Sequence, residues 1–436
     1  MRPLALASIA LLLVALSFGC TPQAAPPGDG GDGGDGGDGD GQVPAGLVQP
    51  ANLVYRGAFR LPDASGGSDW TWSGDAAAYY PGGDAGGPAD GYPGSIYGTG
   101  NDLQKQVSEI TIPAPVISAA HNVDELNTAT TLQPFTDVRA GVGNLDVYQE
   151  VIRTGLAYLP AQGAQTTGKL YLCWGQHFHE TEAEQQPTHM WCELDLTGSQ
   201  GAWRVGDLSL YRVNDYMCDI PASWAEANTP GLRLATGRFR EGGWGGQGPN
   251  LSAIGPWNRG NPPPDGTVLD ATQLLGYSNV LDDPQPYHVL DNYQNSDNWR
   301  GVAWLTTADS AAVVFVGTKG TGDCWYGLPD GTIWPDEPPF PEDPLNQRGW
   351  WSTAYLAQML FYDPSDFAAV AAGTMEPWEP QPYATLDLTD HLFNVTSTQQ
   401  EDLLGECCFD RENGHLYVFE IFGDGDKPLV HVWDVT

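Results

Sequence analysis

The chain has 436 residues and a formal net charge of −37, because 55 Asp and Glu outweigh 18 Lys and Arg. A surface this acidic disfavours nucleic acid and anionic membranes as partners, since both bind through clustered basic side chains. Glycine (55 residues), proline (35) and tryptophan (16) are abundant, and outside Ser365 to Ala372 almost no stretch has an amphipathic helical pattern. The composition therefore predicts an all-β, turn-rich protein.

Residues 1–19 have the pattern of an export signal, with a basic start at Arg2, an apolar run from Leu4 to Leu16 and a small residue, Gly19, just before Cys20. The run ending in Gly-Cys resembles a bacterial lipoprotein cleavage box, in which Cys20 becomes the lipidated first residue. Leu16 lies one place further upstream than is usual in such a box, and Phe18 is bulky, so a plain secretory signal is the alternative. Lipid on Cys20 would be the only membrane attachment and would place the protein at the bacterial cell envelope, on the outer membrane or cell surface.

Residues 20–46 begin with this cysteine and contain a repeating Gly-Asp tract that runs from Gly28 to Gly41. Glycine supplies flexibility and the aspartates repel one another, so we expect a disordered, extended tether. Calcium binding by the aspartates is the alternative, but the repeats lack the apolar residues that build a β-roll. Residues 47–436 are enough for one large β-domain, which we expect to act as a monomer.

A unit of three short apolar strands recurs along this domain. The copies are predicted at 75–80, 94–98 and 104–110; at 155–160, 169–175 and 189–194; at 249–254 and 267–277; at 300–305, 312–317 and 357–363; and at 406–409, 415–419 and 430–434. Five irregular copies with unequal insertions predict a β-propeller of five blades. Six blades are the alternative if the divergent region from Leu208 to Asp297 hides another one, and a β-sandwich with long loops is a further alternative.

The segment Leu53–Leu61 is a lone predicted strand, while the last copy offers only three strands. If the first strand completes the last blade, the ring closes without an open edge. Three motifs, Gly57–Pro62, Gln381–Tyr383 and Asp410–Val418, resemble those of a group of exported bacterial propeller-type proteins that are mostly uncharacterised. This resemblance supports the fold and implies no activity.

Seven cysteines suit an exported protein, and six remain if one carries lipid. Cys173 and Cys192 fall on neighbouring predicted strands, so a disulfide between them is the preferred pair. The other four could form two more bridges, including one between adjacent residues: Cys218, Cys324, Cys407 and Cys408. Metal binding by these cysteines is the alternative, but no Cys-x-x-Cys pair supports it.

The first candidate site is a histidine cluster after the strand at 169–175. In an extended chain His177 and His179 point to one face, as two ligands of one metal ion would, and Glu180 or His189 could be a third ligand. Polar residues at the end of a hairpin strand are also commonly just solvated, and the spacing falls short of a recognised zinc motif. This second interpretation is the favoured one.

The second candidate is an arginine cluster, in which Arg233, Arg238 and Arg240 precede a Gly-rich run containing Trp244. Guanidinium groups suit carboxylate or sulfate ligands, and a Gly-rich loop lets the backbone approach a ligand. The alternative is that these arginines pair with the protein's own abundant Asp and Glu, and this alternative is somewhat favoured.

The third candidate is the Gly-rich stretch 318–327 with Asp323, Trp325 and Tyr326, followed in the same insertion by Trp350 and Trp351. Exposed aromatic rings stack on sugars while carboxylates accept hydrogen bonds from the sugar hydroxyls. Core packing explains most tryptophans in a propeller, but the Gly-rich setting favours a loop for these.

We therefore expect a lipid-anchored, surface-displayed propeller that binds an extracellular glycan or partner protein at one mouth of its channel. A carbohydrate-active enzyme is the second expectation, and a purely structural envelope protein is the third. A glycoside hydrolase needs two facing carboxyl groups, for which the candidates are Asp75, Glu241, Asp323 and Glu406. A polysaccharide lyase needs a base and a group that neutralises a uronate, for which the candidates are His177, His179, Arg238 and Tyr326. The sequence contains no nucleophile elbow, zincin or P-loop motif, and it identifies no cofactor.

Overall fold

The computed structural model of the chain describes residues 46–142, 153–175, 187–208, 212–239, 246–278, 285–344, 347–394 and 402–436. The predicted export signal, the lipidation site at Cys20 and the tether lie outside these residues. Within the described ranges, no helix has the length and apolar character needed to cross a membrane.

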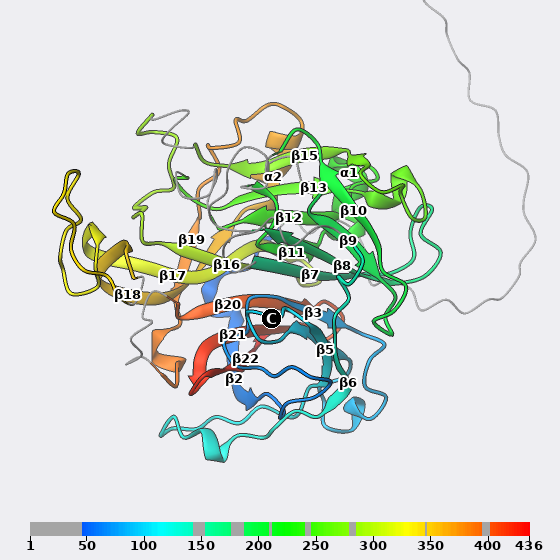
Figure 1. Cartoon of the computed structure of the whole chain (residues 1–436). Coiled ribbons are helices and arrows are strands. Elements are labelled where there is room, and N and C mark those ends of the chain that lie inside the picture. The colour runs from blue at the N-terminus through cyan, green and yellow to red at the C-terminus, as the bar shows by residue number, and fades with distance from the viewer. Residues whose placement is uncertain are drawn as a thin grey trace, which may run out of the picture. The chain divides into compact units, whose positions relative to one another are not determined.

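The strands of the described ranges form five sheets, each built as a meander (Figure 1). Blades one and two contain β3 (Ala77–Tyr80), β4 (Ser95–Thr99), β5 (Val107–Thr111) and β6 (Thr131–Thr136), then β7 (Arg153–Leu159), β8 (Lys169–Gly175), β9 (His189–Cys192), β10 (Gln200–Val205) and β14 (Val268–Leu269). Blade three contains β11 (Tyr216–Asp219), β12 (Leu234–Arg238), β13 (Asn250–Ile254) and β15 (Ala271–Gly276).

Blade four contains β16 (Asn298–Thr306), β17 (Ser310–Gly327), β18 (Gly349–Tyr362) and β19 (Ala384–Asp387), with β1 (Gly46–Leu47) parallel to β17. Blade five contains β20 (Leu404–Asp410), β21 (His415–Asp424), β22 (Lys427–Val435) and β2 (Leu53–Arg60). The helices are α1 (Ala222–Asn228) and α2 (Pro364–Ala371), with short 3-10 turns at Pro50–Asn52, Gly87–Ala89, Val123–Glu125, Pro256–Arg259 and Thr389–His391.

The innermost strands close a ring. β3 contacts β7, β7 contacts β11, β11 contacts β16, β16 contacts β20, and β20 contacts β3 again. The chain is therefore a five-bladed β-propeller, as the repeats predicted. The predicted closure is also confirmed, because β2 pairs antiparallel with β22 from Leu53 opposite Val435 to Arg60 opposite Leu429.

The hydrophobic core lies between the faces of neighbouring blades. Along β16, Val302 and Trp304 pack toward blade three, whereas Ala303 and Leu305 pack toward blade five. Successive side chains of a strand point to opposite faces, and both faces of a blade are covered here. For this reason the sequences of the inner strands are mostly continuous apolar runs, without a regular alternation of apolar and polar residues.

The third blade differs from its predicted position. The segment predicted as its first strand is β13, the third strand, which pairs with β12 on one side and β15 on the other. The first strand, β11, was missed because it is only four residues long and α1 separates it from β12. The divergent region therefore hides the start of blade three and no sixth blade, while Val268–Leu269 pairs in parallel with β10 of blade two.

The insertion in blade four also differs from the prediction, which had a long loop between its second and third strands. Here β17 and β18 continue as a two-stranded ribbon that projects beyond the other sheets, at the left of Figure 1. The pattern failed because this ribbon lies outside the core of the ring, so its sequence lacks the continuous apolar run of a buried strand. We call residues 319–357 the arm.

The disulfide prediction is wrong. The described cysteines, Cys173, Cys192, Cys218, Cys324, Cys407 and Cys408, are all free thiols. On the paired strands β8 and β9, Cys173 lies opposite His189 and Cys192 lies opposite Leu170. The two thiols also enter different core clusters on opposite faces of the blade, whereas a disulfide requires Cβ atoms about 4 Å apart.

Candidate functional site

Polar residues gather at one mouth of the propeller channel. Each blade begins with its innermost strand, so all five innermost strands begin at the same end of the channel. Charged or amide side chains stand at or just before all five of these starts, namely Asp75 before β3, Arg153 at β7, Asp215 before β11, Asn298 at β16 and Asp402 before β20. The mouth is therefore polar by construction.

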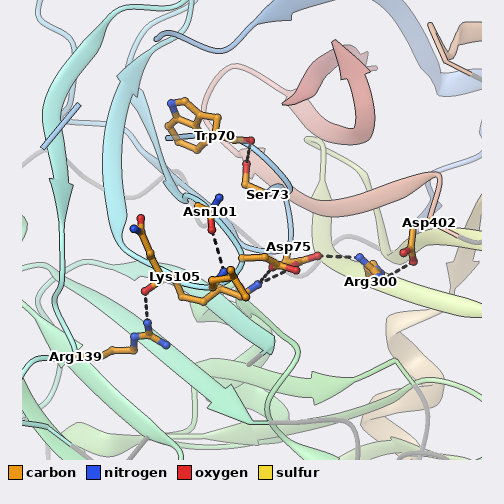
Figure 2. A network of polar contacts seen from close by, with 11 residues as sticks. Trp70, Ser73, Asp75, Asn101, Lys105, Arg139, Arg300 and Asp402 are labelled. Atoms are coloured by element: carbon orange, nitrogen blue, oxygen red, sulfur yellow. Dashed lines mark hydrogen bonds and ion pairs between the residues drawn. The ribbon is translucent and has the colours of Figure 1, made fainter. Parts of the chain in front are cut away.

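One side of the mouth is a chain of alternating charges from blades one, four and five (Figure 2). Lys105 Nζ lies 2.7 Å from Asp75 Oδ2 and also pairs with Asp102. Arg300 Nη1 lies 2.9 Å from Asp75 Oδ1, and its Nη2 lies 2.5 Å from Asp402 Oδ1. We call these five residues the rim network. Because Lys105 is only 2% exposed, its charge needs these carboxylates.

The two carboxyls beside Lys105 have opposite acid–base properties. Burial opposes ionisation of Asp75, but Lys105 and Arg300 outweigh it and hold the pKa of Asp75 well below its usual range. Burial and the nearby charge of Asp75 raise the pKa of Asp102 to about 6. The first group therefore stays ionised under all ordinary conditions, and the second titrates near neutral pH.

The other side of the mouth belongs to blades two and three. Arg238 is fully buried at the end of β12, where its Nε lies 3.6 Å from Asp215 Oδ2 and its Nη1 lies 3.4 Å from Asn214 Oδ1. Asp215 also accepts the backbone N–H of Phe239 at 3.2 Å. This arginine is thus held by the protein's own groups, in line with the favoured interpretation of the arginine cluster.

Glu406 of β20 lies in the channel between the two sides and is fully buried. Its Oε1 accepts the backbone N–H groups of Val302 and Cys407 at 2.9 and 3.0 Å. Burial, reinforced by the negative charges of Asp75 and Asp215, raises the pKa of Glu406 well above its usual range. Burial therefore favours the protonated, neutral form of this side chain.

Several buried polar atoms at the mouth lack a hydrogen-bond partner within the described part of the chain. They are Glu406 Oε2, Asp215 Oδ1, Asn214 Nδ2, Asn298 Oδ1 and Thr154 Oγ1. An unsatisfied buried polar atom costs about 1 to 3 kcal/mol. Other unpartnered buried atoms lie elsewhere in the described chain, among them several tryptophan Nε1 atoms, and those at the mouth stand where water or a ligand can satisfy them.

Below the mouth the channel is narrow. A cavity of about 30 Å³ lies between all five innermost strands, lined by residues such as Ala77, Leu156, Met217, Val302 and Cys407. This volume admits one small molecule at most. A larger ligand would therefore contact the mouth and would not pass through the channel.

The arm rises from the edge of this mouth. The pairing of β16 with β17 ends where Asn298 faces Thr318, and β17 continues past that point with β18 as its only paired strand along most of the arm. Lys319 Nζ contacts both carboxylate oxygens of Asp297 at 2.9 and 3.0 Å, and Thr318 Oγ1 accepts the backbone N–H of Leu403 at 2.9 Å. These contacts fasten the base of the arm to the mouth.

Aromatic side chains cover the arm. Tyr326 lies opposite Trp350, edge to face at a centroid distance of 5.4 Å, and both are half-buried. Trp334 stacks on Phe340 at 5.7 Å, and the Arg348 guanidinium lies 4.9 Å from the centre of the Trp334 ring. Phe340 is 54% exposed. The arm thus presents aromatic faces to solvent, which is unusual for large apolar groups.

The arm is also acidic. Its acids are Asp323, Asp330, Asp336, Glu337, Glu342 and Asp343, and its bases are Lys319 and Arg348. Because Lys319 pairs with Asp297 at the base, the outer part of the arm has a strong negative charge. Polyanionic ligands are therefore disfavoured there.

The structure separates the predicted site residues. Asp323, Trp325 and Tyr326 lie on the arm, whereas Arg238 is buried at the mouth. The described carboxylates Asp75 and Glu406 are brought together at the mouth, as their electrostatic interaction indicates. Other predicted residues lie outside the described ranges, namely His177, His179, Glu180, Arg240, Glu241 and Trp244.

His189 has a structural environment of its own. Its Nδ1 lies 2.8 Å from Thr188 Oγ1 and its Nε2 lies 2.8 Å from Thr236 Oγ1. Burial lowers the pKa of His189 to about 3, so the ring is neutral. Both nitrogens are thus engaged without a metal, and the described residues contain no group of three or more His, Cys, Asp or Glu side chains placed to hold one.

Sequence reasoning missed most of the rim network, although a signal was present. Arg300 and Asp402 lie within five residues of the predicted first strands of their copies, as Asp75 does. A charged residue at the start of each innermost strand would have marked the mouth. Lys105 gave no such signal, because it lies in a loop between outer strands.

No family model matches the chain, and no curated protein matches its sequence. The class of protein therefore follows from the fold and from the site described above. The chain is a five-bladed β-propeller with a polar mouth and a projecting aromatic arm.

Proposed function

We propose that the protein is an extracytoplasmic binding propeller, held at the bacterial cell envelope by lipid on Cys20, that binds an extracellular glycan at the mouth of its channel. The observation that carries this proposal is the set of buried, unpartnered polar atoms at the mouth, beside an arm with half-exposed aromatic rings. Convergent polar groups with flanking aromatic surface suit hydroxyl-rich ligands.

The chemistry of the two parts favours a neutral glycan. At the mouth, donors and acceptors are mixed, since burial favours the protonated form of Glu406 while Asp215 Oδ1 and Asn298 Oδ1 are acceptors. Sugar hydroxyls both donate and accept, so they can satisfy such a set. The acids of the arm disfavour uronate-rich chains.

Affinity electrophoresis tests the proposal, with xylan, galactomannan and mixed-linkage β-glucan as neutral probes and polygalacturonate as the acidic comparison. We expect one of the neutral polymers to retard the protein, and the retardation to be lost in a Tyr326→Ala/Trp350→Ala variant. Ile117→Ala is a matched control, because Ile117 is 64% exposed outside the arm. The same mobility of the wild-type protein in gels with and without each polysaccharide would contradict the proposal.

A carbohydrate-active enzyme is the second candidate, and a specific observation favours it. Asp75 and Glu406 interact electrostatically, yet their environments move their pKa values in opposite directions. Such a pair can supply one ionised carboxylate and one carboxylic acid at the same pH. Release of reducing ends from a bound polymer that disappears in Glu406→Gln, while binding persists, would place this candidate first.

The membrane anchor has its own test, because it rests on the sequence alone. We expect Cys20→Ser to move the expressed protein from the membrane fraction to the soluble fraction. Retention of the variant in the membrane fraction would contradict the anchor and leave the binding proposal untouched.

A further inference from the structure

A second hollow opens on the mouth face of blade one. It has a volume of about 600 Å³ and is lined by two loops, residues 64–69 and 101–104. The first loop leads from β2 toward β3, and the second joins β4 to β5 and ends at Lys105 of the rim network. One wall of the hollow thus leads along the chain into the rim network, and the hollow lies on another blade than the arm.

The two loops are fastened together in the structure. The backbone N–H of Asn101 donates to the Asp69 carbonyl oxygen at 2.8 Å, and the N–H groups of Gln104 and Lys105 donate to the Asn101 carbonyl oxygen at 2.9 and 2.8 Å. Ser65 and Ser68 exchange backbone hydrogen bonds at 3.1 and 3.0 Å. The walls of the hollow are therefore held in place before any ligand arrives, which lowers the entropic cost of binding.

The lining groups have the chemistry of a sugar subsite. Ser68 is 6% exposed, and its Oγ has no hydrogen-bond partner among the described residues. Burial opposes ionisation of Asp69, but hydrogen bonds from Thr71 and Asn101 outweigh it and lower the pKa of Asp69. Leu103, 76% exposed, adds an apolar surface. A permanent carboxylate, a free hydroxyl and an aliphatic patch match the two faces of a pyranose ring.

We infer that this hollow is a second sugar subsite, so that the ligand is a chain of several sugar units that crosses the mouth from blade one toward the arm. The inference rests on the proposed glycan-binding function and adds the length of the ligand. A single sugar could occupy only one of the two places, whereas a chain gains contacts in both.

Isothermal titration calorimetry with xylo-, manno- and cello-oligosaccharides of increasing length tests the inference. For the series that binds, we expect affinity to rise with length. The double variant Leu103→Ala/Gln104→Ala should weaken binding of the long members about fivefold to tenfold, which corresponds to one lost hydrogen bond and one lost apolar contact. Binding of the shortest members should stay as in the wild type. Leu132→Ala in blade one is the control, because Leu132 is 40% exposed on β6.

Ser68→Ala separates a binding role from a structural one. Removing an unsatisfied buried hydroxyl should leave the free energy of unfolding unchanged or slightly higher, while affinity for long oligosaccharides falls. Oligosaccharides that bind the double variant and the wild type equally well at every length would overturn the subsite and leave the glycan proposal standing. If no oligosaccharide binds the wild type, the glycan proposal fails and the subsite fails with it.

Discussion

Strands β17 and β18 run through both the ring and the arm, yet their side chains are buried in the first part and mostly exposed or half-buried in the second. Inside the ring, residues 311–318 of β17 are all buried, whereas none of residues 321–326 further along the same strand is buried. Strand pairing is continuous through both parts apart from one bulge. Hydrogen bonding of the backbone therefore fixes the shape of the hairpin, while packing against neighbouring blades decides which residue types it can carry.

This difference extends to charge. In the ring, cations are enclosed by carboxylates, as Lys105 is by Asp75 and Asp102. On the arm most acids have no basic neighbour in the sequence and face water. Charged residues of the ring should therefore be essential to stability, and those of the arm should matter mainly for contact with a ligand.

The largest effect should come from removing a buried charge of the ring. Lys105→Met leaves Asp75 and Asp102 beside each other without their shared cation, and we expect a loss of about 3 to 5 kcal/mol in the free energy of unfolding. Lys105 has a φ of 48°, a strained value for lysine and methionine alike, so the backbone cost is unchanged. Urea denaturation measures the effect.

Arg56→Met is the matched control for that experiment. Arg56 pairs with Asp434 but is 46% exposed, and a solvent-exposed pair contributes little to stability. Equal losses in the two variants would show that the rim network carries no special weight.

The next largest effect on stability should come from replacing a glycine of the ring with alanine, and the same replacement on the arm is its comparison. At Gly405 of β20 a Cβ atom would lie 2.1 Å from the Gly74 carbonyl oxygen, whereas at Gly349 of the arm the nearest atoms are 4.0 Å away. We expect Gly405→Ala to cost about 1 to 3 kcal/mol or more through forced backbone movement. Gly349→Ala should be neutral or slightly stabilising. A comparable loss in both would mean that the arm is packed as tightly as the ring.

A pH-dependent effect should follow from Asp102. Its pKa is raised to about 6 from the ordinary 3.8, so between about pH 4 and pH 6 the folded state holds a proton that the unfolded chain has released. Stability must therefore fall as pH rises through this window. This fall in the free energy of unfolding should be on the order of 1 to 2 kcal/mol, less than the full pKa shift would give, because part of the shift comes from the coupling with Asp75. It should be absent in Asp102→Asn.

Melting temperatures of the wild type and the variant across this pH range measure the difference. Asp330 on the arm should affect stability in the opposite direction, because hydrogen bonds from Thr332 lower the pKa of Asp330. Any contribution of Asp330 to the stability of the fold is therefore lost as pH falls. Parallel pH profiles for the wild type and Asp102→Asn would contradict the assigned proton.

The smallest effect on stability should come from removing most of the arm. Trp325 lies directly opposite Trp351, so an Asn-Gly turn can replace residues 326–350 and close a two-residue hairpin. We expect the shortened protein to unfold within a few degrees of the wild type, because the ring core is untouched, and to lose glycan retardation. A large drop in the melting temperature would show that the arm supports the ring.

The apolar strands of the ring could be predicted from the sequence, and the polar site only in part. The predicted strand at 169–175 coincides with β8, since every residue of that strand is buried and apolar side chains dominate it. Strand β11 was missed because four residues give too little periodicity. The starts of inner strands were visible around Asp75 and Arg300, but their ion pair depends on how five blades close, which no local pattern contains.

The closing strand has a consequence for the order in which the protein folds. β2 occupies residues 53–60, and its partner β22 occupies residues 427–435, so all the other blades lie between them in the sequence. During synthesis β2 therefore keeps an unpaired edge until β22 and all the residues between them have been made. Loop closure over such a distance is slow, so the pairing of β2 with β22 should be the last step in closing the ring. Until then the sheets of the nascent chain form an open ring, and the exposed edge of β2 can pair with strands of other chains. The yield of the closed propeller therefore depends on how well this edge is protected during folding.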